Sequence, residues 1–280
     1  MCQLLGMNCN TPTDILFSFE GFHRRGGLTD HHADGWGIAF FEGRGVRLFL
    51  DDKPSADSPV AALVRQYPIK SQNVIAHIRK ATQGEVNLAN CHPFQREMWG
   101  QYWIFAHNGN LVDFAPAAGC HYQPVGGTDS EAAFCYIMEQ LRQRWCQPPS
   151  LDELFEAIEG LAATLRSYGV FNFMLSNGQW LFTHCSTKLH YIVRQAPFPT
   201  AHLVDDDVTV DFSTVTTPDD RVAVIATVPL TDNETWTAMQ DGELALFVDG
   251  RVHRRSVTLP ATRPASCCGN DATASDPAQS

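Results

Sequence analysis

The sequence predicts an α+β fold in which β-sheets and helices form separate layers. Strand patterns fill most of the chain before residue 110, two consecutive helix patterns follow, and strand patterns return between residues 170 and 248. Strands and helices grouped in this way are typical of the class, whereas α/β folds alternate one strand with one helix. Neither a repeat nor a linker interrupts the chain, so we expect one domain over residues 1–257.

The first half of the chain is predicted to consist mainly of strands. Runs of apolar residues bounded by turn residues, such as residues 42–45, indicate them. Thr13 is expected to cap a helix over residues 14–22, and Ser58 with Pro59 is expected to open a second, short helix. The expected strands are residues 2–8, 36–41, 46–50, 74–78 and 102–107.

The second half begins with the two central helices. Thr128 and Glu131 form a capping-box pattern at the start of the first, which runs to about Trp145. The second begins at Ser150 and ends near Gly169, because glycine suits a C-terminal cap. Strands are expected at residues 170–175, 180–184, 189–193, 208–212, 222–226 and 244–248, and a hairpin turn at residues 249–250.

The composition argues against several classes of protein. Hydrophobic residues make up 44% and charged residues 18%, as in soluble globular proteins, and no apolar run is long enough for a membrane span. The net charge of −11 argues against a nucleic-acid partner. No signal-type stretch follows Met1, so we expect a cytoplasmic protein. The composition of residues 261–280 predicts a disordered tail, and no pattern predicts the oligomeric state.

Cys2 is distinguished from the other cysteines by its position. The nine cysteines form no CxxC pair, so neither a zinc ribbon nor a redox motif is supported. If Met1 is removed, an α-amine that titrates near ~8 lies on the same residue as the thiol and can take its proton. This is the arrangement of N-terminal nucleophile catalysis. The alternative is an ordinary cysteine that follows the first methionine.

Three further motifs have both a functional and a structural interpretation. Arg79, at the end of a predicted strand, can bind a carboxylate or form a surface ion pair. Asn108 and Gly109 can supply two oxyanion donors, or they can form a tight turn. Asp129 can pair with a substrate ammonium at a helix start, beside the capping pattern.

Two groups of residues contain side chains of the types that bind metals. They are Asp30-His31-His32 with Asp34, and Cys91-His92. Their spacing matches no ligand pattern and they lie far apart in the chain, so we expect neither a metal nor a cofactor. We interpret the glycines at positions 35 and 37 as sites where a strand packs closely near the N-terminus.

Several motifs occur in one order along the chain. They are Met1-Cys2, Asp34-Gly35-Trp36-Gly37-Ile38-Ala39, His77-Ile78-Arg79-Lys80-Ala81-Thr82, His92-Pro93-Phe94, His107-Asn108-Gly109 and Gly127-Thr128-Asp129-Ser130-Glu131. This ordered set resembles the class-II glutamine amidotransferases, which are N-terminal nucleophile hydrolases. Residues 24–27, 67–71, 185–190 and 226–231 resemble the stand-alone YafJ-type subgroup. The likeness extends from Cys2 to about Val257.

The resemblance implies a four-layer α/β/β/α sandwich and a set of site residues. Cys2 would attack the side-chain amide of glutamine, and Asn108 and Gly109 would stabilise the oxyanion. Arg79 would bind the α-carboxylate of the substrate and Asp129 its α-ammonium. A thioester on Cys2 would then be hydrolysed, so that the products are glutamate and ammonia.

The resemblance leaves three functions open. The chain would be a glutaminase that supplies an unknown synthase, a hydrolase of another γ-glutamyl compound, or a non-catalytic module that keeps the fold. The presence of all the expected site residues argues against the last. Two positions depart from the family pattern: Gln83 stands where several relatives have histidine, and Cys91 where threonine is expected.

Overall fold

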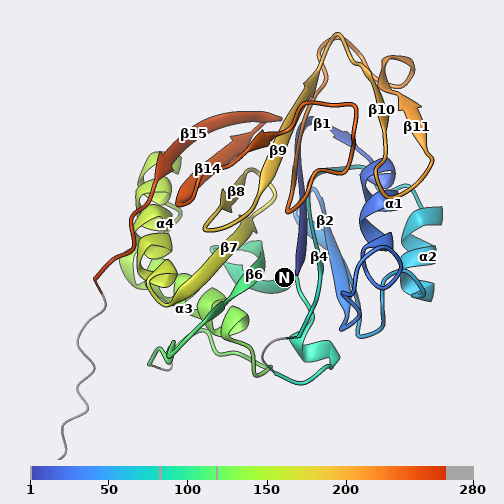
Figure 1. Cartoon of the computed structure of the whole chain (residues 1–280). Coiled ribbons are helices and arrows are strands. Elements are labelled where there is room, and N and C mark those ends of the chain that lie inside the picture. The colour runs from blue at the N-terminus through green and yellow to red at the C-terminus, as the bar shows by residue number, and fades with distance from the viewer. Residues whose placement is uncertain (1, 82–83, 118, 263–280) are drawn as a thin grey trace, which may run out of the picture.

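The computed structural model describes residues 2–81, 84–117 and 119–262, and it contains two β-sheets that pack face to face (Figure 1). The predicted tail lies outside the described residues from position 263 onward. The first sheet has seven strands, and all its neighbouring strands are antiparallel. In spatial order they are β13 (Thr237–Ala238), β9 (His190–Gln195), β12 (Arg221–Ala226), β1 (Gln3–Thr13), β4 (Ser71–Ile78), β2 (Trp36–Glu42) and β3 (Gly45–Asp51).

The second sheet has six strands and is also antiparallel throughout. Its order is β15 (Arg251–Val257), β14 (Glu243–Val248), β8 (Leu181–His184), β7 (Gly169–Ser176), β6 (Gln101–Leu111) and β5 (Phe94–Met98). A separate two-stranded ribbon is formed by β10 (Thr200–His202) and β11 (Thr209–Asp211), and short 3₁₀ turns cover Leu88–Asn90 and Phe212–Thr214.

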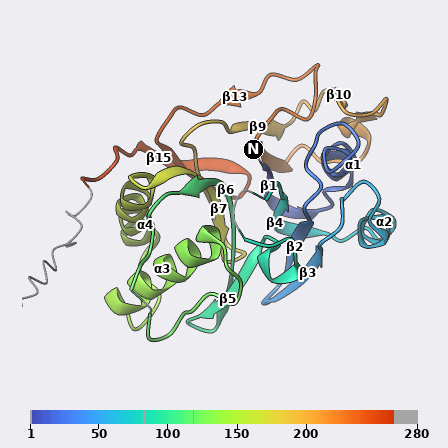
Figure 2. The same cartoon turned by 60° about the horizontal axis from the view of Figure 1, so that its bottom comes forward.

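Within the described ranges, four helices cover the outer faces of the sheets (Figures 1 and 2). Helices α1 (Leu16–Arg24) and α2 (Pro59–Gln66) lie on the first sheet, and α3 (Asp129–Arg144) and α4 (Leu151–Arg166) lie on the second. One buried apolar cluster lies between each pair of adjacent layers. The predicted α+β class and the four-layer α/β/β/α order are therefore confirmed. No helix in the described part of the chain is long and apolar enough to cross a membrane.

The alternation of side chains along β1 places Cys2 between the sheets. Leu5 and Met7 belong to the cluster under α1 and α2, whereas Leu4 belongs to the cluster between the two sheets. Successive side chains in a strand point to opposite faces, so Cys2 lies on the same face as Leu4. Gly6 also lies on that face, and a Cβ there would come within 2.8 Å of the sulfur of Met174, so the glycine lets the sheets approach.

The predicted helix caps are largely confirmed. The hydroxyl oxygens of Ser58, Thr128 and Ser150 each accept the backbone N–H three residues later, at distances of 3.2–3.3 Å. The reciprocal contact expected from Glu131 is not made, because its carboxylate accepts the Gly126 N–H at 2.7 Å instead. Each of these caps satisfies one N–H group that the first helical turn leaves unpaired.

Three expected boundaries were wrong. Strand β1 continues to Thr13, so this residue does not cap α1, which has Ile15 at that position without a side-chain hydrogen bond. Helix α4 ends at Arg166, and Gly169 opens β7 instead of closing the helix. Strand β6 does not end at residue 107, and it includes the Asn108-Gly109 step. That step pairs with β7, and this pairing overrides the tendency of Asn-Gly to form a turn.

Candidate active site

Cys2 and Arg79 lie beside each other at one end of the first sheet. Gln3 is the residue opposite Ile78 in the pairing of β1 with β4, so the two strands carry Cys2 and Arg79 to the same position. The Cys2 sulfur accepts the Lys80 N–H at 3.2 Å and also lies 3.3 Å from the Lys80 carbonyl oxygen. The structure therefore brings together the expected nucleophile and the expected carboxylate-binding residue.

Burial favours the protonated form of the Cys2 thiol. Burial raises its pKa above the ordinary value of 9.0, while the hydrogen bond from Lys80 and the positive charge of Arg79 act in the opposite direction. A thiol whose pKa lies above the working pH reacts only after a base has taken its proton. The site consequently needs such a base close to the sulfur.

Asn108 reaches Cys2 from the second sheet. Its Nδ2 donates to the Cys2 carbonyl oxygen at 2.5 Å, although the two residues are 106 positions apart in the chain. The Asn108 side chain is buried, and its Oδ1 has no hydrogen-bond partner within the described ranges. This contact joins the two sheets at the site and places an amide N–H donor beside the expected nucleophile.

Gly109 directs its backbone N–H to the edge of β6. It lies opposite Phe171 in β7, but the Phe171 N–H donates to Ser186 Oγ at 2.7 Å, away from β6. In an antiparallel pair the backbone groups of both residues point either toward each other or away from each other. The Gly109 N–H therefore points to the other side of β6, where β5 pairs only as far as Phe105. A Cβ at Gly109 would collide with the Val170 carbonyl oxygen, so only glycine fits.

Asp129 lies on the same edge of β6. It is the first residue of α3, and its Oδ2 accepts the Leu111 N–H at 2.7 Å while Oδ1 accepts the Ser130 N–H at 2.9 Å. Leu111 is two residues after Gly109, so both N–H groups point to one side of the strand. Asp129 is thereby placed next to the Gly109 N–H, although no hydrogen bond joins Asp129 to Cys2 in the part of the chain that the structure describes.

Asn90, which was not predicted as part of the site, connects the loop after β4 to the start of α3. The Arg79 guanidinium donates to the carbonyl oxygens of Gly84 and Glu85, at 3.3 and 3.0 Å. Asn90 donates to the same Glu85 oxygen at 2.9 Å and accepts the Gly127 N–H at 2.9 Å. The Asn90 amide therefore fixes the loop at Gly84 and Glu85, which binds the Arg79 guanidinium, relative to the segment that precedes Asp129. A single asparagine in a loop gives no sequence signal for such a role.

Asp34, which was considered as a metal ligand, instead holds the end of β4. Its Oδ2 accepts the Ala81 N–H at 2.8 Å, and its own N–H donates to the Arg79 carbonyl oxygen at 3.2 Å. Gly35 has a φ of +105°, and a Cβ there would lie 2.7 Å from the Cys91 sulfur, as expected for close packing at this glycine. Across the described ranges, no group of three or more His, Cys, Asp or Glu residues is arranged to hold a metal ion.

Cys91 and Gln83 are the two positions that depart from the family pattern. Of these, only Cys91 lies in the described residues, and its thiol is not exposed. Cys91 is buried, and burial raises the pKa of its thiol to about 11. Its sulfur contacts the carbonyl oxygens of Asn87 and Asp51, at 3.4 and 3.5 Å. Gln83 lies outside the described residues.

The buried histidines of the site are neutral. His107 Nε2 faces the Val170 carbonyl oxygen at 3.1 Å and so carries the hydrogen, while Nδ1 accepts the Ser130 hydroxyl at 2.8 Å. Burial lowers the pKa of His107, and it lowers that of His77 to about 3. Burial also lowers the pKa of His92 well below 6.5. His107 therefore contributes by holding β6 against the start of α3, not by carrying charge.

Comparison with known proteins gives consistent findings. The family described as glutamine amidotransferases class-II matches residues 1–269. A Haemophilus influenzae protein named "Putative glutamine amidotransferase" is 59% identical over 250 residues, which are 89% of this chain and 85% of that protein. The Escherichia coli protein named "Putative glutamine amidotransferase YafJ" is 53% identical over 251 residues, which are 89% of this chain and 98% of that protein.

Two solved structures are also similar to this chain. A "predicted glutamine amidotransferase" from Pseudomonas aeruginosa is 51% identical with a TM-score of 0.74, and the match covers 90% of this chain and 100% of that one. The glutamine phosphoribosylpyrophosphate amidotransferase of B. subtilis is only 14% identical, with a TM-score of 0.55 over 91% of this chain and 49% of that one. The second likeness concerns the fold alone.

Proposed function

This chain belongs to the class-II glutamine amidotransferase family, and on that premise we propose that it hydrolyses the side-chain amide of glutamine to glutamate and ammonia, with Cys2 as the nucleophile. The observation that carries the proposal is the contact between Asn108 Nδ2 and the Cys2 carbonyl oxygen at 2.5 Å. It puts a hydrogen-bond donor from the second sheet beside the only cysteine that lies at the start of the chain. A transition state with negative charge on oxygen needs such a donor.

The proposed base is the α-amine that removal of Met1 would leave on Cys2. The pKa of the thiol is raised by burial, so at neutral pH the thiol holds its proton until a base takes it. An α-amine titrates near ~8, so a minor but usable fraction is neutral at physiological pH, and it lies within reach of the sulfur on the same residue. It accepts the thiol proton while the sulfur forms a bond to the amide carbon and the carbonyl electron pair moves to oxygen.

The proposed oxyanion donors are Asn108 Nδ2 and the Gly109 N–H. Asn108 Nδ2 carries two hydrogens, and the contact with the Cys2 carbonyl oxygen uses one of them. The intermediate collapses when the C–N bond breaks and the α-ammonium of Cys2 gives its proton to the departing nitrogen, which leaves as ammonia. Water then attacks the thioester, the carbon–sulfur bond breaks, and glutamate leaves with the thiol restored.

The proposed substrate contacts use the two charges of a free amino acid. Arg79 would bind the α-carboxylate, because a guanidinium offers paired N–H donors that match a carboxylate. Asp129 would bind the α-ammonium, and its oxygens, which each accept a backbone N–H, retain lone pairs for this contact. Opposite charges at these two places select a substrate that carries both.

The test of the proposed function is ammonia release by purified protein. We expect release from L-glutamine in preference to asparagine and to a panel of γ-glutamyl amides and peptides. A strong preference for another γ-glutamyl compound would defeat the glutaminase assignment and support the alternative hydrolase. No release from any compound in the panel would favour the non-catalytic module.

The Arg79→Ala variant is expected to raise KM for glutamine roughly 10- to 150-fold, which corresponds to the ~1.5–3 kcal/mol of a charge-assisted hydrogen bond. The change should be small for 4-aminobutanamide, which is glutamine without its α-carboxylate. Arg47→Ala is the matched control, since Arg47 is exposed, forms an ion pair with Glu42 across a surface turn and lies over the Tyr67 ring. An unchanged KM for glutamine in Arg79→Ala would contradict the assigned contact.

A further inference from the structure

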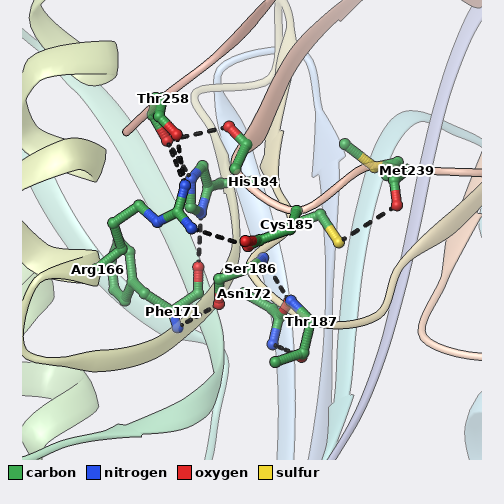
Figure 3. Close-up of polar contacts among 11 residues, drawn as sticks. Arg166, Phe171, Asn172, His184, Cys185, Ser186, Thr187, Met239 and Thr258 are labelled. Carbon is green, nitrogen blue, oxygen red and sulfur yellow. Dashed lines mark hydrogen bonds and ion pairs between the residues drawn. The ribbon is translucent and has the colours of Figure 1, made fainter. Parts of the chain in front are cut away.

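Asn172 lies in β7 directly opposite Asn108, and its side chain is fully buried. Its Oδ1 accepts the backbone N–H groups of Ser186 and Thr187, at 2.9 and 3.1 Å. Its Nδ2 donates to Thr187 Oγ1 at 2.8 Å and to the Asn108 carbonyl oxygen at 2.9 Å. Figure 3 shows Asn172 facing the turn that contains Ser186 and Thr187. The amide thus makes four hydrogen bonds, two as acceptor and two as donor.

The turn fixes which end of the Asn172 amide faces Asn108. Two backbone N–H groups can bond only to an acceptor, so the oxygen must face Ser186 and Thr187 and the NH₂ group must face β6. Ser186 is itself held in place, because its hydroxyl oxygen accepts the Phe171 N–H at 2.7 Å. A flipped amide would place its NH₂ against two donors, and that orientation is therefore excluded.

The Asn108 carbonyl oxygen, which accepts from Asn172 Nδ2, belongs to the same peptide unit as the Gly109 N–H. The peptide bond between Asn108 and Gly109 is trans, so its C=O and its N–H point in opposite directions within one plane. In the pairing of β6 with β7 this oxygen also faces the Asn172 backbone N–H, so the side chain is a second donor that helps to fix the direction of the N–H on the far side of the strand. It also polarises the peptide and strengthens the N–H as a donor.

We infer that Asn172 is a positioning residue for the oxyanion: through the Asn108 carbonyl oxygen it aims and polarises the Gly109 N–H. This inference rests on the proposed function, because it assumes that the Gly109 N–H stabilises the oxyanion. It also gives a role to the segment Cys185-Ser186-Thr187-Lys188, whose turn orients Asn172. Asn172 itself does not contact the nucleophile in the described structure.

The Asn172→Asp variant tests the inference because it keeps the acceptor and removes the donor. The Ser186 and Thr187 N–H groups favour the ionised carboxylate, which cannot donate to the Asn108 oxygen. We expect kcat for glutamine at pH 8 to fall roughly 10- to 100-fold, with KM within about threefold of wild type. A donor that acts only on the oxyanion changes the transition state and leaves substrate binding unaltered.

A second readout separates positioning from a general loss of structure. L-Glutamate γ-semialdehyde can add the Cys2 thiol across its carbonyl group: the sulfur bonds to carbon and the thiol proton goes to oxygen. The hydroxyl oxygen of this adduct occupies the oxyanion position, so the inhibition constant of the semialdehyde should rise, by a smaller factor than kcat falls because this oxygen is uncharged. The inhibition constant of glutamate, the product, should remain unchanged.

The matched control is Asn73→Asp. Asn73 is also buried, donates to the Gly178 carbonyl oxygen at 2.7 Å and accepts from Asn8 at 2.9 Å, but it lies at the opposite end of β4 from Arg79. We expect this variant to lose thermal stability and to keep its kcat per folded molecule. Unchanged kcat and semialdehyde inhibition in folded Asn172→Asp would overturn the inference and leave the proposed function intact. A wild-type protein that does not hydrolyse glutamine would overturn both.

Should Asn172→Asp fail to fold, Thr187 supplies the same test. Thr187→Val removes the hydroxyl that accepts from Asn172 Nδ2, and Thr187→Ser retains a hydroxyl there. We expect kcat to fall by about 3- to 10-fold in the valine variant, with KM unchanged, and to recover in the serine variant. Equal kcat values for the two variants would contradict the inference.

Discussion

Replacement of Cys2 by alanine is expected to reduce ammonia release from glutamine by at least about 10³-fold, since the proposed thioester forms on its sulfur. The Cys2 side chain is half-buried, and among the described residues its sulfur bonds to the Lys80 backbone, so the variant should fold normally. The measurement is steady-state ammonia release, together with thermal unfolding of both proteins.

Cys146→Ala provides the matched control for this change. Cys146 is an exposed free cysteine in the segment between α3 and α4, and its loss should leave turnover unchanged. Turnover by Cys2→Ala at the wild-type rate would remove Cys2 from the mechanism.

Asn108→Ala is expected to lower kcat for glutamine by about 10²- to 10³-fold, with KM within about threefold of wild type, as for the loss of one oxyanion donor elsewhere. The amide contributes twice, because its Nδ2 is both the proposed oxyanion donor and the group that donates to the Cys2 carbonyl oxygen. Steady-state kinetics with glutamine separate the effects on kcat and KM.

Asn177→Ala is the corresponding control. The Asn177 amide donates to Gln101 at 2.7 Å, in the turn between β7 and β8 at the other end of the second sheet. Its removal should leave kcat unchanged. A rise in KM with no change in kcat in Asn108→Ala would show that Asn108 binds the substrate and does not stabilise the oxyanion.

Local patterns in the sequence predict the inner strands and the central helices well. Strands β2, β4 and β7 are runs of apolar residues with β-propensity, and α4 begins at Ser150, its N-cap, where a helix start was expected. Strands β5, β10, β13 and β15 were not predicted. Of these, β13 and β10 are only two and three residues long, and β15 contains three arginines. Their conformation depends on pairing with neighbours, which local propensity does not contain.

The candidate site was predicted as a set of residues, and its arrangement was not. Cys2 meets Arg79 only because β1 and β4 pair in a register that sets Gln3 opposite Ile78. Asn108 was expected just after a strand, and it lies within one, where its side chain faces the other sheet. Register and sheet packing are consequences of the whole fold, so a motif by itself cannot predict them.

Supporting residues were the hardest to predict. Asn172 is 64 residues from Asn108 in the chain, and the turn that orients it follows a further strand. Asn90 lies in a loop and acts on segments at Glu85 and Gly127. An isolated asparagine has no periodicity, and its partners become visible only when the strands and loops are assembled.

Mass spectrometry of the N-terminal peptide, after turnover of glutamine is quenched in acid, tests the central claim most directly. The account predicts a peptide that begins at Cys2, without Met1, and a fraction that carries a glutamyl group as a thioester on this residue. A glutamyl group attached to another cysteine, or full activity in protein that retains Met1, would contradict it.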